Sequence, residues 1–271
     1  MRRVQAITCV AFTHQVSRIN VLVRSTRWSY DLESDLVVRN ATVPDRREPT
    51  TVVVSDGRIE SITTESDDAG ADGVPDVNGD ELTTIDADGG LVAGGFVDPH
   101  VHLDKAYVAP DLPPNESGTL AEAIASIHER KADYTREDVR DRAIRAIEAH
   151  VRNGCTRIRT HVDVDTIGGL TPLEGVVAAR EACADVADVE IVAFPGRDRT
   201  GRGDRRLTRA RARVGADLIG GMPDNERTDA DRRAHVDVCL DLAGCYDVGV
   251  DMHVDETDDP RRDHSSTSRP R

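Results

Sequence analysis

Long apolar runs, aromatic residues and paired cysteines are all scarce in this sequence. No apolar run approaches the roughly 18–20 residues that a membrane-spanning helix requires, so we expect no membrane partner. Aromatic residues make up only 3% of the 271 residues, and the core must therefore be built mainly from aliphatic side chains. The cysteines are odd in number and scattered, without a C-x-x-C pair, which favours reduced thiols and a cytoplasmic location over a disulfide framework. They are Cys9, Cys155, Cys183, Cys239 and Cys245.

Lysine is nearly absent, although charge is abundant. Of the 35 basic residues only Lys105 and Lys131 are lysines, and 50 acidic residues bring the formal net charge to −15. Such a surface is strongly hydrated and stays soluble where salt screens its self-repulsion, and we interpret it as a halophile-type composition. The same charge argues against nucleic acid as a partner, because phosphate binding requires a basic surface.

Positive charge is concentrated in three segments. Residues 1–30 contain five arginines and no acid, residues 196–214 contain eight arginines and two aspartates, and residues 260–271 contain four arginines and one aspartate. A basic loop for phosphate and an exposed surface loop are two interpretations of the middle segment. A third is that frame disruptions in a GC-rich gene replaced the ancestral sequence in these segments.

Apolar runs and turn residues indicate two kinds of structure along the chain. Short strands separated by turns form a small β unit in the first third. From residue 92 onward, apolar runs alternate with helical patterns, which is typical of βα units around a parallel sheet. The expected strands lie within residues 35–39, 51–55, 58–62, 82–86, 92–102, 155–164, 189–195, 216–223 and 248–256. The expected helices lie at residues 118–132, 136–153, 172–185 and 229–243.

Five βα units are counted, whereas a closed (β/α)8 barrel needs eight. We therefore expect an α/β chain whose main domain, residues 92–259, is an incomplete (β/α)8 TIM-type barrel with a metal site. Residues 34–91 form the smaller β portion that precedes it. Residues 1–33 are interpreted as a poorly ordered N-terminal extension, and residues 260–271 as an aberrant C-terminal tail.

Two histidines end the first apolar run of the barrel region. Side chains two apart on a strand point to the same side, so His100 and His102 converge, and neutral imidazoles placed in this way suit a divalent cation. His253 ends another apolar run and is a third candidate ligand. Glu256 follows three residues later and is a candidate proton carrier for a metal-activated water. The alternative is that these are unrelated polar residues, with Glu256 a solvated acid.

Four further polar residues near strand ends are candidates for the substrate pocket. Asp104 and Lys105 directly follow the histidine pair. His161 and Asp163 end the next strand and line the same pocket, or else form a polar pair near the core. Three more histidines fall on expected helices and are interpreted as surface residues: His128, His150 and His235.

Five blocks, in order, resemble the amidohydrolase superfamily and specifically its cytosine deaminase-like branch. They are GGFVDPHVHLDK, RIRTHVDV, VEIVAFP, GADLIGGMP and DMHVDETDDP, and the resemblance covers about residues 35–195 and 215–259. It implies a distorted (β/α)8 barrel flanked by a small β-sandwich portion. It also implies a small-molecule heterocyclic substrate and hydrolytic deamination of an amidine such as cytosine.

The resemblance also implies a cofactor and the roles of particular residues. One divalent metal ion, Fe2+ or Zn2+, is expected. By match, His100 and His102 look like first-strand metal ligands, and His253 looks like the fifth-strand ligand. Glu256 is similar to the glutamate that carries the proton in the family.

The chain also departs from the family pattern. Gly196 stands where cytosine deaminases typically have a glutamine that contacts the base, and nothing supplies the family's histidine after the sixth strand or its aspartate after the eighth. We therefore expect this apparently truncated chain to have little or no deaminase activity in isolation. The alternatives are a non-catalytic fragment, or half of a split enzyme with a complementing chain or a second copy. A second enzymatic alternative is an amidohydrolase for a triazine or a cyclic amide.

Overall fold

The computed structural model describes eight stretches of the chain, which fall into two compact units. The described residues are 9–11, 18–23, 26–31, 36–55, 58–64, 83–195, 214–254 and 256, of which residues 9–31 are described by their backbone alone. The first unit comprises residues 1–98, 148–157 and 184–188, and the second comprises residues 99–147, 158–183 and 189–271.

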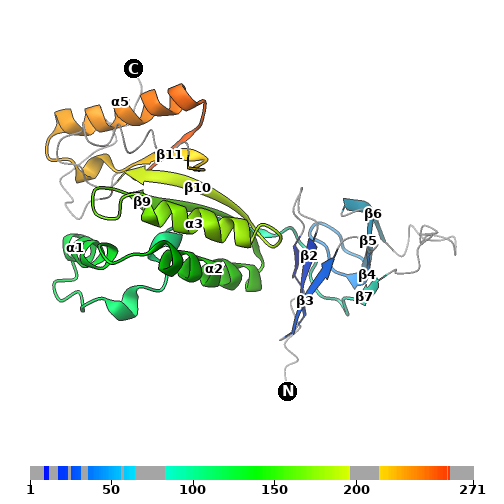
Figure 1. Ribbon diagram of the computed structural model, residues 1–271. Helices are drawn as coiled ribbons and strands as arrows, with labels where there is room; N and C mark the ends of the chain where they lie inside the picture. The colour runs from blue at the N-terminus through cyan, green and yellow to red at the C-terminus, as the bar shows by residue number, and fades with distance from the viewer. Residues whose placement is uncertain are drawn as a thin grey trace. The chain divides into compact units, whose positions relative to one another are not determined.

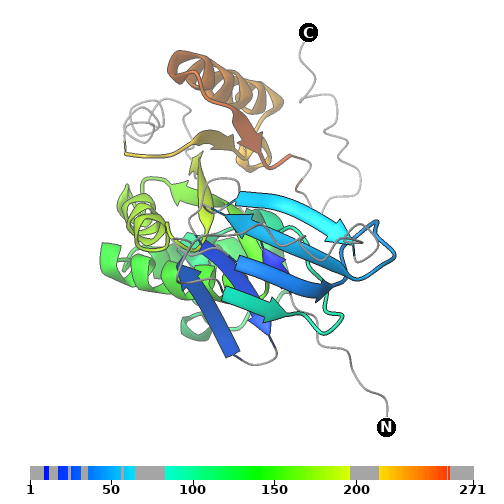
Figure 2. The ribbon, with the colours of Figure 1, turned by 90° about the vertical axis from the view of Figure 1, so that its right-hand side faces the viewer.

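The first unit contains two sheets. One has three antiparallel strands in the order β1-β2-β3, and the other has four strands in the order β6-β5-β4-β7 (Figure 2). In the second sheet β4 pairs in antiparallel with β5, β5 pairs in antiparallel with β6, and β4 pairs in parallel with β7. The bounds are β1 (Cys9–Ala11), β2 (Arg18–Val23), β3 (Thr26–Asp31), β4 (Leu36–Ala41), β5 (Thr50–Ser55), β6 (Arg58–Thr64) and β7 (Thr83–Asp86).

Both faces of the four-stranded sheet are buried at its centre. Leu36 pairs with Val54 on one face, where both belong to a buried apolar cluster. Val37 pairs with Val53 on the opposite face, and these two are also fully buried. Burial on both faces explains why these strands are continuous runs of valine rather than alternating polar and apolar residues.

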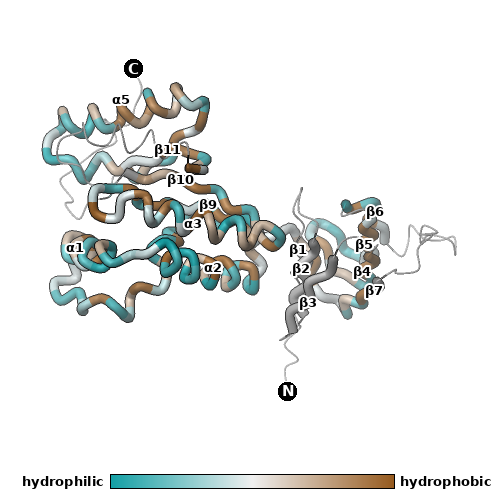
Figure 3. The backbone as a smooth tube through the Cα atoms, in the orientation of Figure 1, coloured by the Kyte–Doolittle hydropathy of each residue, from teal (hydrophilic) through white to brown (hydrophobic). Residues whose placement is uncertain are grey.

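The second unit is built around a curled five-stranded sheet in the order β12-β11-β10-β9-β8. β10, β11 and β12 pair in parallel. β10 contains a run of buried apolar residues, Ile191 to Phe194, which is coloured towards brown in Figure 3. The bounds are β8 (Phe96–Val101), β9 (Cys155–Val164), β10 (Asp188–Pro195), β11 (Leu218–Gly221) and β12 (Val250–Met252).

Helices follow the strands, as the alternation of patterns predicts (Figure 1). Thr119 caps the first helix and Thr135 accepts a hydrogen bond from the backbone of Asp138 at the start of the second. Gly154 ends the second helix with a φ of 85°, a conformation that favours glycine. The bounds are α1 (Leu120–Lys131), α2 (Arg136–Arg152), α3 (Thr171–Ala182) and α5 (Asp229–Tyr246), with short 3-10 turns η1 (Leu103–Lys105), η2 (Ala109–Asp111) and η3 (Pro223–Asn225).

The prediction of a partial TIM-type barrel is confirmed at the level of a curled half-barrel with its helices. The flanking β-sandwich and the four domain limits stay predictions, although β1, β2 and β3 fall within the predicted extension 1–33. The arginine-rich segments 196–214 and 260–271 lie outside the described residues apart from Val214. Among the described helices none is both long enough and apolar enough to cross a membrane.

A substitution at Gly175 tests how closely α3 packs against α2. A Cβ at Gly175 would lie 2.6 Å from the Cβ of Val139 and 2.9 Å from the carbonyl oxygen of Arg136. We therefore expect Gly175→Ala to lower the free energy of unfolding by about 1–3 kcal/mol, measured by urea denaturation.

Gly244 on α5 is the matched control, because a Cβ there meets nothing within 4 Å. Gly244→Ala should raise the free energy of unfolding by about 0.5–1 kcal/mol. Equal destabilisation at the two glycines would contradict the close approach of α2 and α3.

Candidate metal-binding site

Three histidines converge at the carboxyl ends of β8 and β12. His100 lies on β8, His102 follows that strand directly, and His253 follows β12. The backbone N–H of His253 donates to the carbonyl of Gly221 at 2.8 Å, which fixes this residue beside β11. One ring nitrogen from each histidine lies within 4.8 Å of the others. The strands that sequence analysis predicted thus bring the three candidate ligands together.

The local contacts leave His102 and His253 able to bind a cation. The Nδ1 of His102 lies 2.9 Å from the carbonyl oxygen of His161 and 3.3 Å from the Nζ of Lys105. The tautomer with its proton on Nδ1 donates to the carbonyl and leaves the Nε2 lone pair free for a cation. Burial lowers the pKa of His102 to about 3 and that of His253 to about 4, so both rings are neutral near pH 7. The Nδ1 of His253 is buried without a hydrogen-bond partner. Neutral imidazoles of this kind fit a divalent transition metal.

His161 is a fourth imidazole against this group. Its side chain is fully buried, and its ring centroid lies 4.4 Å from that of His100 and 4.8 Å from that of His253. Its Nε2 lies 3.3 Å from a carboxylate oxygen of Asp251, without the alignment of a hydrogen bond. Asp251 in turn accepts from Arg159 at 2.8 Å. His161 thus supports the histidine group from beneath and does not line the pocket itself.

Asp163 connects both lysines of the chain. It accepts from the Nζ of Lys105 at 2.6 Å and forms an ion pair with the fully buried Lys131. Burial disfavours the ionised carboxylate, but the two ammonium groups outweigh it and hold the pKa of Asp163 well below its usual range. Lys131 also binds Asp165 at 2.6 Å. The end of β9 is therefore tied to η1 and to α1 by charge.

Asp104 lies beneath this ion-pair group. Its carboxylate is fully buried, and it accepts from the backbone N–H of Asp163 at 3.1 Å and from Lys105 at 3.3 Å. Burial raises the pKa of Asp104. Among the sequence-predicted pocket residues, Lys105 and Asp163 line the pocket, whereas Asp104 contacts them from behind.

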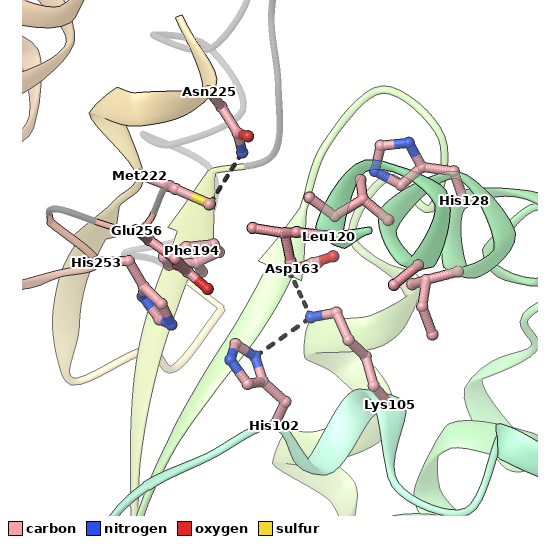
Figure 4. Close-up of a pocket in the computed structure, with 13 residues that line it drawn as sticks. His102, Lys105, Leu120, His128, Asp163, Phe194, Met222, Asn225, His253 and Glu256 are labelled. Carbon is pink, nitrogen blue, oxygen red and sulfur yellow. Dashed lines mark hydrogen bonds and ion pairs between the residues drawn. The ribbon is translucent and has the colours of Figure 1, made fainter. Parts of the chain in front are cut away.

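A pocket of about 250 Å³ opens beside the histidines. Figure 4 shows Lys105 between His102 and Asp163, with His253 and Glu256 across the pocket from α1. Its polar lining residues are His102, Lys105, His128, Asp163, Asn225, His253 and Glu256. Its apolar lining residues are Leu120, Ala123, Ile124, Ile127, Phe194 and Met222.

Glu256 is a half-buried acid that faces this pocket. Its backbone N–H donates to a carboxylate oxygen of Asp224 at 3.1 Å, and its own Oε2 is buried without a hydrogen-bond partner. Burial raises the pKa of Glu256, and the nearby Asp224 raises it further. Glu256 is therefore less solvated than the alternative interpretation assumes.

The surface interpretation of the helical histidines also needs correction. His128 is half-buried and lines the pocket. The side chain of His235 is only 8% exposed, and its Nε2 accepts from the backbone N–H of Met222 at 3.2 Å. It fits because Gly221 leaves room beside β11, where a Cβ would lie 2.9 Å from the ring. His150 is half-buried, 3.0 Å from Asp98.

Sequence analysis missed the wall that α1 contributes and the burial of Lys131. The signal for the first was present, because Leu120, Ala123, Ile124 and Ile127 have the spacing of one helix face. The signal for the second was the rarity of lysine itself. Of only two lysines in the chain, one lines the pocket and the other is buried at the end of α1.

Removal of the Lys131 ammonium tests the ion-pair group. Lys131→Met leaves Asp163 and Asp165 with less compensation in a buried environment, and we expect it to lower the free energy of unfolding by about 3–5 kcal/mol. The matched control is Arg140→Ala, which removes an exposed ion pair with Asp141 and should change stability by less than about 0.5 kcal/mol. Urea denaturation at pH 7 measures both, and equal midpoints for the two variants would contradict the assignment.

The destabilisation caused by Lys131→Met should also depend on pH, in a direction that the pKa of Asp165 predicts. Burial opposes ionisation of Asp165, but Lys131 outweighs it and lowers the pKa of Asp165. A carboxyl with a lowered folded-state pKa stabilises the fold above its unfolded pKa of about 3.9, and this contribution is lost as the pH falls through the folded-state value. The deficit of Lys131→Met should therefore shrink below a pH of about 4.

Comparison with known proteins relates the chain to heterocycle deaminases and amidohydrolases. No family model matches the chain. A solved 5-methylcytosine deaminase from Klebsiella pneumoniae is 36% identical with a TM-score of 0.72, over 83% of this chain and 52% of that one. An N-isopropylammelide isopropyl amidohydrolase from Pseudomonas sp. is 29% identical, over 81% of this chain and 53% of the relative. A pterin deaminase from Rhizobium rhizogenes is 29% identical, over 66% and 40%.

The chain spans about half the length of the relatives that it matches. The chain belongs to the amidohydrolase superfamily, as a homologue of its deaminase-like hydrolases.

Proposed function

We propose that this chain carries the metal centre of a hydrolase that cleaves a non-peptide C–N bond of a small heterocycle, as in hydrolytic deamination of a cytosine-like amidine. The observation that carries the proposal is the convergence of three imidazoles beside a pocket that also contains an unpartnered carboxylate, Glu256. The imidazole nitrogens supply metal ligands, and a carboxylate that lines the same pocket supplies a proton carrier.

His100, His102 and His253 would hold one divalent ion, Fe2+ or Zn2+. Imidazole nitrogen suits both metals, and the hydrogen bond from His102 to the His161 carbonyl orients that ring for coordination. When bound, the metal supplies Lewis acidity that makes water a nucleophile near neutral pH.

Glu256 would move the proton. A raised pKa lets its carboxylate take a proton from the attacking water and donate it to the leaving nitrogen at ordinary pH. The burial of Oε2 without a partner keeps this oxygen available for the transfer. Glu256 takes a proton from water as the new C–O bond forms and delivers it to the leaving nitrogen as the C–N bond breaks, so that the proton ends on the released ammonia or amine.

The remaining polar wall would orient the substrate ring. Lys105 presents an ammonium to the pocket, and its neighbours Asp104 and Asp163 raise the pKa of Lys105 in spite of burial, so it stays protonated. An ammonium can donate to a ring nitrogen or an exocyclic oxygen. Asn225 lines the pocket opposite α1, where its Nδ2 contacts the sulfur of Met222 at 3.0 Å.

A triazine is the second candidate substrate ring. Two relatives are named for N-isopropylammelide, a triazine with an alkylated amine, and the solved one from Burkholderia multivorans is 28% identical with a TM-score of 0.65. The chemistry is the same, with an alkylamine in place of ammonia as the leaving group.

Metal content tests the ligand set. The purified chain, loaded with Zn2+ and desalted, is expected to retain about one metal ion per chain by elemental analysis, because three imidazoles converge on one point. His102→Ala and His253→Ala should each reduce this content at least about tenfold. His150→Ala is the control, since His150 pairs with Asp98 away from the cluster. Unchanged metal content in both ligand variants would contradict the proposed site.

Binding and turnover test the chemistry. The metal-loaded chain is expected to bind 5-fluorocytosine by calorimetry and to lose this binding after chelation. Glu256→Gln should keep the metal and slow ammonia or isopropylamine release from cytosine, pterin or N-isopropylammelide by at least about 100-fold. Glu129→Gln, at an exposed position on α1, is the control.

The outcomes separate the candidate functions. Binding without any release by the wild-type chain would favour the non-catalytic alternative, in which another chain completes the enzyme. Release that is unaffected by Glu256→Gln would refute the assigned proton carrier.

A further inference from the structure

An apolar stripe on α1 forms one wall of the pocket. Leu120, Ala123, Ile124 and Ile127 follow the i, i+3, i+4, i+7 spacing that places side chains on a single helix face. All four line the pocket, and all four are only half-buried. The stripe therefore faces the cavity and not the core.

The helix that carries this stripe is fixed at both ends. At its start, the hydroxyl of Thr119 accepts from the backbone N–H of Glu122 at 3.3 Å. At its end, Lys131 is fully buried and forms ion pairs with Asp163 and Asp165. Because the last residue of α1 is bound to the end of β9, the stripe is held at a set distance from the metal side of the pocket.

The opposite wall carries most of the polar groups of the pocket, together with Phe194 and Met222 (Figure 4). His102, Lys105, Asp163, His253 and Glu256 face the same space with charged or hydrogen-bonding groups. Figure 4 shows Leu120 and His128 on the α1 side and His253 and Glu256 across from them. A ligand that fills this pocket must therefore be polar at one edge and apolar at the other.

An unsubstituted heterocycle meets only half of this requirement. Its nitrogen and oxygen atoms satisfy the polar wall, but it leaves the isoleucines of α1 facing water. An alkyl group on the ring or on the leaving amine would cover them and remove apolar surface from water. The cavity volume of about 250 Å³ leaves room for a six-membered ring with such a group.

We propose that Ile124 and Ile127, with Leu120 and Ala123, form a subsite for an alkyl substituent, so that the preferred substrate is an alkylated heterocycle. This inference rests on the proposed function of the same pocket and adds its selectivity. The polar wall binds the heteroatom edge of the ring, and the α1 wall selects the substituent.

Two matched ligand pairs test the subsite. The full-length, Zn2+-loaded chain is titrated by calorimetry with cytosine against 5-methylcytosine, and with ammelide against N-isopropylammelide. We expect the alkylated member of at least one pair to bind about tenfold more tightly or better, which is the size of effect that one buried alkyl group has in an apolar pocket. The pair that responds identifies whether the substituent lies on the ring or on the amine.

Variants assign this preference to α1. Ile124→Ser and Ile127→Ser should each reduce the preference for the alkylated ligand to about threefold or less. Ala125→Ser is the matched control, because Ala125 is exposed on the same helix and does not line the pocket. Circular dichroism verifies that each variant is folded.

The results of these titrations distinguish failure of the alkyl subsite from failure of the proposed function. Equal affinities within both pairs for the wild-type chain would overturn the subsite and leave the proposed hydrolase standing. A preference that survives both isoleucine variants would also overturn it, because the selectivity would then lie elsewhere in the pocket. Failure of all four ligands to bind the metal-loaded chain would overturn the proposed function together with the subsite.

Discussion

The contact of Asp163 with two lysines holds the parts of the pocket together. Lys105 comes from the turn after the histidine pair, Lys131 comes from the last residue of α1, and Asp163 itself ends β9. Three segments far apart in sequence are thereby bound to one carboxylate. Buried charges of this kind are stable only when each has a partner, so the geometry of these segments is interdependent. The same ion pairs therefore set the distance between the α1 wall of the pocket and the wall that contains Lys105 and Asp163.

Burial has opposite effects on the two kinds of titrating group at the site, and both effects suit the chemistry. It lowers the pKa of His102 and of His253, so that both imidazoles are neutral near pH 7. It raises the pKa of the Glu256 carboxyl group. A single low-dielectric environment therefore prepares ligands on one side and a proton carrier on the other. Burial alone would lower the pKa of Lys105, but the negative charges of Asp104 and Asp163 outweigh this effect and raise it.

Sequence patterns predicted the elements of this fold more fully than the contacts between them. The alternation of apolar runs and helical stretches located β8 to β12 and their helices. The signal is clearest for β10, whose apolar residues are buried on both faces, whereas Phe96 and Val97 of β8 are exposed. The H-x-H spacing located His100 and His102, since strand geometry alone places them on one side. The buried positions of Lys131 and His235 could not be predicted in this way. They depend on which residues from other elements, such as Asp165 and Gly221, lie beside them.

The scarcity of lysine has a consequence for covalent chemistry. Arginine supplies nearly all positive charge, and the two lysines contribute ammonium groups that are 20% and 0% exposed in their side chains. Acylating reagents, amine cross-linkers and lysine-modifying enzymes therefore find no lysine on the open surface. The one lysine that a small electrophile can reach is Lys105, inside the pocket. Because Asp104 and Asp163 keep the Lys105 ammonium protonated, this lysine is a poor nucleophile, and the chain should resist lysine-directed labelling.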